Sequence, residues 1–218
     1  MQVKDVVIVL SDYPSGNFIQ MIFKTGIRIL SISILTFSIY SISHLQLGNA
    51  QIENWKRYYD PDQKFTFLYP PNWVVNSTHN DINGLTEAIL TNPNPNSTRT
   101  KVSVIYNPND SLLDSNAGKP VLPSKALTNL EDQLSVDYLF FNSTGKFPHK
   151  YLIQGYQSAS DMIDYEKIKG KPGKMLIVLA KITDKDSLVF TYTESKRTFY
   201  KNLSNASQII KSISILNH

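Results

Sequence analysis

The chain of 218 residues contains no cysteine, only four histidines and a low share of charged residues, 18%. Without cysteine the protein cannot form disulfide bonds, and it cannot hold zinc or an iron–sulfur cluster through thiolates. Lysine and arginine exceed aspartate and glutamate by 22 to 18, and this small excess is dispersed along the sequence. Such a charge pattern argues against nucleic acid as a partner.

The motifs of common catalytic sites are also missing. The sequence has no phosphate-binding loop, dinucleotide fingerprint or His-Glu-x-x-His zinc motif. After residue 50 the histidines are His79 and His149, which fall in polar segments, and His218, which is the final residue. None of them is accompanied by a Gly-x-Ser-x-Gly nucleophile turn. The sequence therefore predicts no catalytic residue, and we expect the protein not to be an enzyme.

An apolar stretch without formal charge, residues 29–47, stands near the beginning of the chain. Lys24 and Arg28 precede it, and it leads into Leu47-Gly48-Asn49-Ala50. A positive flank, a short apolar run and small residues before the cut are typical of a secretory signal peptide, here cleaved after Ala50. The run is also just long enough for an uncleaved membrane anchor. A buried core helix fits less well, because two cations directly precede the run. We therefore expect an extracytoplasmic protein, either secreted or anchored to the membrane by residues 29–47.

These features divide the chain into three segments. Residues 1–20 form an extension that does not fit a signal peptide, because such peptides begin close to the initiator methionine. Met21 lies just before the cationic flank, so we interpret it as the true start of translation. Residues 21–50 are then the signal peptide or anchor, and residues 51–218 form a single globular domain.

A short aromatic segment organises this domain. Phe65, Phe67 and Tyr69 alternate with other residues, which predicts a strand with one aromatic face. Pro70-Pro71 then ends the strand, because proline lacks the backbone N–H that a sheet requires. Trp73 follows at once and opens a second strand. We expect these aromatic side chains to form a buried corner of the core.

The remaining patterns predict further strands and two helices. Strands are expected at residues 85–91, 101–106, 151–156, 159–168, 175–180 and 187–193, and residues 76–84 form a polar loop. Helices are expected from Ser124 to about Leu139 and from about Leu203 to Ile213. Residues 175–180 are nearly all apolar, so this strand should be covered on both faces. The fold class is α+β, an antiparallel sheet flanked by helices and preceded by an apolar N-terminal helix.

The aromatic corner resembles the opening of PsbP-like domains, the relatives of an extrinsic lumenal protein of photosystem II that share a fold with the Mog1 family. The resemblance lies in Tyr59-Asp60-Pro61-Asp62-Gln63-Lys64 followed by Phe65-x-Phe67-x-Tyr69-Pro70-x-x-Trp73, and again in Ile209-Ile210-Lys211-Ser212-Ile213-Ser214-Ile215. It runs from about Trp55 to the C-terminus. It implies an α/β/α sandwich with a short terminal strand after the last helix, and it speaks to fold more than to activity.

Two groups of carboxylates are candidate metal ligands. Asp60 and Asp62 flank a proline, and Asp161, Asp164 and Glu166 form a second acidic group. Neither group has the spacing of a calcium-binding EF-hand loop, and the broken alternation of the second group prevents all three carboxylates from sharing one face of a strand. We therefore expect a turn at Asp60 and Asp62. No metal or cofactor follows from the sequence, although some photosystem relatives are associated with calcium.

Two surface features are potential sites of interaction or modification. Lys167, Lys169, Lys171 and Lys174 surround a glycine–proline turn and could contact anionic lipid or an acidic partner, or could simply be solvated. Six asparagines begin Asn-x-Ser/Thr sequons and are candidate glycosylation sites, which we expect mostly in loops or beside a helix start: Asn76, Asn96, Asn109, Asn142, Asn202 and Asn205.

Two classes of function follow. The favoured one is a non-enzymatic, extracytoplasmic binding or accessory domain that associates with a membrane protein complex or the cell surface. The alternative is a secreted small-molecule binder or hydrolase whose site is built from distant loops. The alternative requires a pocket with converging polar groups near His79, His149 or the acidic clusters. The small-molecule ligand of such a site is not indicated by the sequence.

Overall fold

Seven antiparallel strands form the main sheet in the computed structural model, which describes residues 54–93, 100–113, 121–146 and 151–216. The strands follow the order β3-β4-β5-β9-β8-β7-β6. Their bounds are β3 (Val74–Asn80), β4 (Leu85–Thr91), β5 (Lys101–Asn107), β6 (Phe140–Lys146), β7 (Gln157–Glu166), β8 (Pro172–Lys181) and β9 (Ser187–Ser195). The predictions for residues 1–20 and 21–50, and those for Asn96, His149 and His218, fall outside the described residues.

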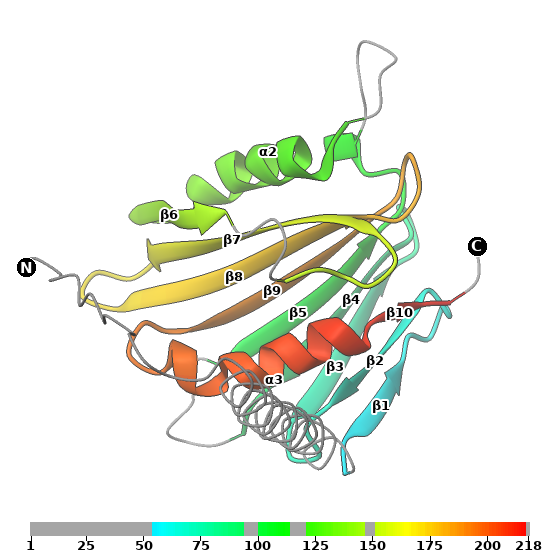
Figure 1. Ribbon diagram of the computed structural model, residues 1–218, viewed down its shortest axis with the longest axis horizontal. Coiled ribbons are helices and arrows are strands. Elements are labelled where there is room, and N and C mark those ends of the chain that lie inside the picture. The colour runs from blue at the N-terminus through cyan, green and yellow to red at the C-terminus, as the bar shows by residue number, and fades with distance from the viewer. Residues whose placement is uncertain (1–53, 94–99, 114–120, 147–150, 217–218) are drawn as a thin grey trace, which may run out of the picture. The chain divides into compact units, whose positions relative to one another are not determined.

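One helix covers each face of this sheet, as Figure 1 shows. The helix α2 (Pro123–Ser135), with the short helix η2 (Ser111–Leu113) before it, packs on β7 and β8 through buried apolar residues that include Leu127, Ile163 and Ile177. The helix α3 (Phe199–Ser212) packs on the opposite face. Every residue of β8 from 173 to 180 is buried, which confirms that this apolar strand is covered on both sides. The α+β sandwich predicted from the sequence is therefore present.

A second, smaller sheet carries the aromatic corner. It has the order β1-β2-β10, with β1 (Lys56–Tyr59), β2 (Phe65–Tyr69) and β10 (Ser214–Ile215). Phe65 and Phe67 are fully buried, Trp73 is nearly so, and Tyr69 is half-buried. The backbone N–H of Trp73 donates to the carbonyl oxygen of Pro70 at 3.0 Å, so the double proline forms the turn by which the chain passes from the small sheet to the main one.

Several sequence predictions were wrong, and exposure explains most of them. The segment predicted as a polar loop, 76–84, is mostly strand β3 and its turn. The first predicted helix, expected to run to about Leu139, ends at Ser135, and strand β6 follows it. Both β3 and β6 are edge strands of the main sheet with mostly exposed side chains, so neither shows a clear alternation of apolar and polar residues. Residues 151–156 form turns instead of a strand, and β1 was not predicted.

None of the helices within the described ranges has both the length and the apolar character that a membrane span requires.

Candidate functional site

One end of the main sheet collects six of the twelve exposed cations of the described residues. The strand register places the start of β5, the end of β9 and the start of β8 side by side, because Lys101 pairs with Thr193 and Thr193 pairs with Met175. The β7–β8 turn and the β9–α3 connection lie at the same end (Figure 1). We call this region the basic end; its exposed cations are Lys101, Lys167, Lys169, Lys171, Lys196 and Arg197.

The opposite end of the sheet carries a group of aspartates. Asp81 lies in the β3–β4 turn with 98% of its side chain exposed, and Asp184 lies in the β8–β9 turn with 85% exposed. Asp62, Asp110 and Asp186 belong to the same end, where Asp186 accepts a hydrogen bond from Tyr106 at 3.1 Å. The cations Lys64, Lys181 and Lys185 offset part of this charge, and Lys181 is paired with Asp184 at 2.7 Å. The exposed Arg57 and Lys211 also lie near this end, where they line a pocket with residues 154–156, just before β7. We call this region the acidic end after its aspartates; its cations offset most of their charge, whereas the cations of the basic end outnumber the carboxylates there.

Exposed apolar side chains stand among the lysines of the basic end. Val136 and Leu139, in the connection from α2 to β6, are 82% and 70% exposed, and Phe140 at the start of β6 is 51% exposed. Ile168, in the β7–β8 turn, is 58% exposed. The backbone N–H of Leu139 donates to the carbonyl oxygen of Glu166 at 2.8 Å, which holds these two segments together. We call these four residues the apolar tip.

A pocket of about 390 Å³ opens between the lysines of the basic end. Lys101, Lys167 and Lys171 line it together with Tyr165 and Glu194. Glu194 is buried and accepts hydrogen bonds from the hydroxyl groups of Thr100 and Thr198 and from the side chain of Asn202. Its carboxylate lies at the N-terminus of α3, where the helix dipole favours a negative charge. Glu194 is therefore satisfied by the protein itself, and the lysines are the groups that a ligand would meet.

A buried ion pair supports the basic end from within. Lys174 is only 7% exposed at its side chain and donates to Asp164 at 2.7 Å, while the exposed Lys196 donates to the second oxygen of Asp164, also at 2.7 Å. Burial raises the pKa of the Asp164 carboxyl, but the hydrogen bonds from the two lysines outweigh this and hold its pKa below the usual range. The sequence grouped Lys174 with the surface lysines, and this was wrong, because Lys174 points into the protein.

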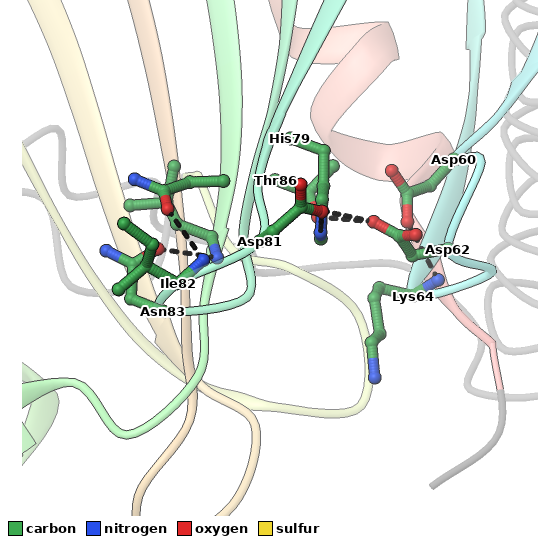
Figure 2. Close-up of polar contacts among 10 residues, drawn as sticks. Asp60, Asp62, Lys64, His79, Asp81, Ile82, Asn83 and Thr86 are labelled. Atoms are coloured by element: carbon green, nitrogen blue, oxygen red, sulfur yellow. Dashed lines mark hydrogen bonds and ion pairs between the residues drawn. The ribbon is translucent and has the colours of Figure 1, made fainter.

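Figure 2 shows where His79 lies. Its side chain extends from β3 toward the β1–β2 turn, where Nδ1 lies 2.5 Å from Asp62 and 3.4 Å from the hydroxyl of Thr86. Its Nε2 lies 3.1 Å from Asp81. Thr86 also donates to Asp62 at 3.1 Å. The cluster fastens the turn of the small sheet to the main sheet, and the same ring nitrogen faces Asp62 and Thr86, so the arrangement lacks the relay of a catalytic triad.

The predicted metal ligands do not converge. Asp60 is buried and its carboxylate accepts the backbone N–H of Lys64 at 3.0 Å, which makes it part of the expected turn. Burial raises the pKa of Asp60. Asp161 accepts a hydrogen bond from Ser143 at 2.5 Å on the α2 face of the sheet, whereas Asp164 faces α3. Within the described parts of the chain, no three histidine or carboxylate side chains are arranged to hold a metal ion.

We expect the replacement of His79 by alanine to change the free energy of unfolding by less than about 1 kcal/mol, because solvent-exposed ion pairs contribute little. The side chains of His79 and Asp62 are 36% and 34% exposed. Denaturant titration of the variant and the parent protein measures the difference. A loss above about 2 kcal/mol would show that this cluster is a main structural link between the sheets.

The sequons lie in regular elements more often than the sequence predicted. Asn76 lies in β3 and Asn142 in β6, so the expectation was wrong for these two. Asn202 and Asn205 lie in the first two turns of α3, near a helix start as expected, and Asn109 lies in a turn. Asn76, Asn109 and Asn142 are exposed, and glycosylation at these sites remains a prediction. A glycan on Asn202 would be attached to the same side-chain nitrogen that donates to Glu194.

Comparison with solved structures identifies the fold. Cyanobacterial PsbP (CyanoP) from Synechocystis sp. PCC 6803 aligns with a TM-score of 0.50 and 12% sequence identity over 74% of this chain and 92% of that one. LpqN of Mycobacterium tuberculosis aligns with a TM-score of 0.50 and 13% identity over 75% of this chain and 91% of that one. The chain has a PsbP-like fold. This confirms the resemblance seen in the sequence.

The Ran-binding protein Mog1p of Saccharomyces cerevisiae also aligns, with a TM-score of 0.49 and 11% identity over 75% of this chain and 96% of that one. No protein-family model matches the chain, and no curated protein matches its sequence. At these levels of identity, the PsbP-like likeness concerns the fold and leaves the activity open.

Proposed function

We propose that this chain is a non-enzymatic, extracytoplasmic accessory domain that binds through its basic end to a negatively charged partner at a membrane. The observation that carries the proposal is the uneven distribution of charge, with an excess of exposed cations at one end of the main sheet. Six exposed cations gather at the basic end, whereas the exposed carboxylates Asp81 and Asp184 lie at the other end. Such a distribution orients a protein against an anionic surface and speeds the encounter.

The comparisons and the sequence agree with this assignment. LpqN, which has the same type of fold, is described as involved in cell envelope biogenesis. Residues 29–47 provide an export signal or an anchor. The alternative of a secreted binder or hydrolase requires a pocket beside His79, His149 or the acidic clusters. The pocket at the basic end is lined by Tyr165, between Asp164 and Glu166, but by neither of these carboxylates and not by His79.

Two measurements on the full chain in cells test the proposal. Protease added to intact cells should degrade the domain, because the proposal places the domain outside the cytoplasm. A photo-crosslinking amino acid at Lys171 should capture a membrane component, whereas the same group at Lys185, an exposed lysine of the acidic end, should not. Protection from external protease, or equal crosslinking at both positions, would contradict the proposal.

A further inference from the structure

We propose that the basic end docks directly on an anionic lipid bilayer, with the apolar tip inserted among the lipid headgroups and the lysines placed against phosphates. This inference rests on the proposed function and specifies the partner and the contact surface. It depends on observations of side-chain type and exposure that the uneven distribution of charge alone does not include. The alternative occupant of this end is an acidic protein surface.

The apolar tip has the properties of an interfacial membrane anchor. Leu139, Phe140 and Ile168 each expose more than half of their side chains, and they project from two neighbouring segments, the α2–β6 connection and the β7–β8 turn. Burying these side chains in the headgroup region would remove apolar surface from water. Since Lys167, Lys169 and Lys171 flank Ile168 in the same turn, insertion would bring their ammonium groups to the level of the lipid phosphates.

Aromatic packing holds this surface in place. The ring of Tyr138 lies 5.4 Å from that of Phe141 and 5.1 Å from that of Tyr165, and the ammonium group of Lys167 lies 5.6 Å from the centre of the Tyr138 ring. These contacts join the α2–β6 connection to the end of β7. The residues on either side of these contacts are therefore already held in place before binding, and this reduces the conformational entropy that is lost on binding.

The kind of cation favours lipid over protein. Five of the six exposed cations of the basic end are lysines and only Arg197 is an arginine. Protein–protein interfaces are depleted in lysine and enriched in arginine, whose planar group binds carboxylates in a fixed geometry. Flexible lysines suit a fluid layer of phosphates, and each lysine near such a surface strengthens binding by roughly fivefold. The exposed Asp137 is the main opposing charge beside the tip.

Orientation supports the same partner. With the basic end on the bilayer, Asp81 and Asp184 at the far end of the main sheet point away from the anionic surface. The pocket of about 390 Å³ lined by Lys101, Lys167 and Lys171 would then open toward the phosphates. Repulsion of the acidic end and attraction of the basic end select one docking pose.

The absence of cysteine makes a residue-specific test direct, because one introduced cysteine is the only thiol in the chain. The full-length variants Leu139→Cys and Ile168→Cys carry an environment-sensitive fluorophore, and Ile82→Cys, at a 96% exposed position in the turn of the acidic end, is the matched control. Each is mixed with vesicles of phosphatidylcholine alone and with vesicles containing about one third phosphatidylglycerol. The readout is local, so an insertion of residues 29–47 does not affect the comparison.

We expect a blue shift at positions 139 and 168 with the anionic vesicles and none at position 82. The triple change Lys167→Glu, Lys169→Glu and Lys171→Glu in the labelled Leu139→Cys protein should weaken this response by at least roughly 100-fold in lipid concentration. The control change Lys185→Glu should leave it intact. A blue shift that is equal at positions 139 and 82, or that survives the triple change, would overturn the inference.

The experiment also separates this inference from the proposed function. If positions 139 and 168 stay hydrated on both kinds of vesicle while Lys171 crosslinks to a protein in cells, the lipid contact is refuted and the accessory role stands. If neither vesicles nor a cellular partner engages the basic end, both proposals fail.

Discussion

Replacement of Phe67 by alanine should lower the free energy of unfolding by about 3–5 kcal/mol, the range for deleting a buried aromatic side chain. Phe67 is fully buried in β2, and its ring stacks on Tyr58 at 4.8 Å and lies 6.1 Å from Phe65 and 6.3 Å from Tyr69. Removing it leaves a cavity between the small sheet and the core that also includes α3. The contacts of three other aromatic rings are lost together.

Tyr59 provides the matched control for this change. It lies on the neighbouring strand β1 and is 65% exposed, so its replacement by alanine should cost less than about 0.5 kcal/mol. Denaturant titrations of both variants against the parent protein measure the two values. If the Phe67 and Tyr59 variants are equally stable, the small sheet is not part of the cooperative core, and the aromatic corner does not organise the fold.

The second large effect concerns the ion pair beneath the basic end. Replacement of Lys174 by alanine should lower the free energy of unfolding by about 3–5 kcal/mol. The change removes the buried partner of the Asp164 carboxylate, which is itself mostly shielded from solvent. Asp164 is 17% exposed, and without Lys174 its charge is balanced by Lys196 alone. Lys174 also packs with its ammonium group 5.9 Å from the centre of the Phe199 ring. We expect the loss at neutral pH, where Asp164 is ionised.

Replacement of Lys196 by alanine is the control, because Lys196 contacts the same carboxylate from a side chain that is 54% exposed. This change should lower the free energy of unfolding by less than about 1 kcal/mol. If the two variants lose the same free energy of unfolding, the burial of Lys174 does not strengthen its ion pair with Asp164.

The stability of the folded protein should depend on pH through Asp164. The pKa of Asp164 is lowered in the folded protein, so its pairing stabilises the fold at pH values above the ordinary aspartate pKa of about 3.9. This stabilisation is lost as the pH falls through the lowered pKa of the folded state. The difference in stability between the parent protein and the Lys174→Ala variant should therefore be full at neutral pH and shrink under acid conditions. Asp60 acts in the opposite direction, because its raised pKa makes its ionised form unfavourable in the fold.

Much of the fold could be predicted because buried elements leave periodic apolar patterns in the sequence. The double-sided burial of β8 follows from an almost continuous apolar run, and the corner at Phe65 and Phe67 follows from alternating aromatics ended by two prolines. Of the two edge strands, only the start of β3 at Val74 was predicted, and the rest of β3 and all of β6 could not be found in this way. Their pairing energy comes from backbone hydrogen bonds to a neighbour, and their exposed side chains carry no period.

The candidate site was harder to predict from the sequence than the fold. The sequence located the lysines at 167, 169 and 171 but could not separate the exposed ones from Lys174, because burial is decided by what packs above a strand residue. It also treated the charge as dispersed, since Lys101 and Arg197 lie far from these lysines along the chain. The antiparallel register of β5, β9 and β8 brings them to one end.

The sequence by itself therefore determined the class of fold and the aromatic corner, because each depends on the order of residues close together in the chain; the export segment stays a prediction. The tertiary structure alone decided that Lys101 and Arg197 gather with the lysines of the β7–β8 turn at one end of the main sheet, and that four apolar side chains stand among these cations. The physical reason is that strand register, which sets these neighbours, is fixed by pairing between distant segments.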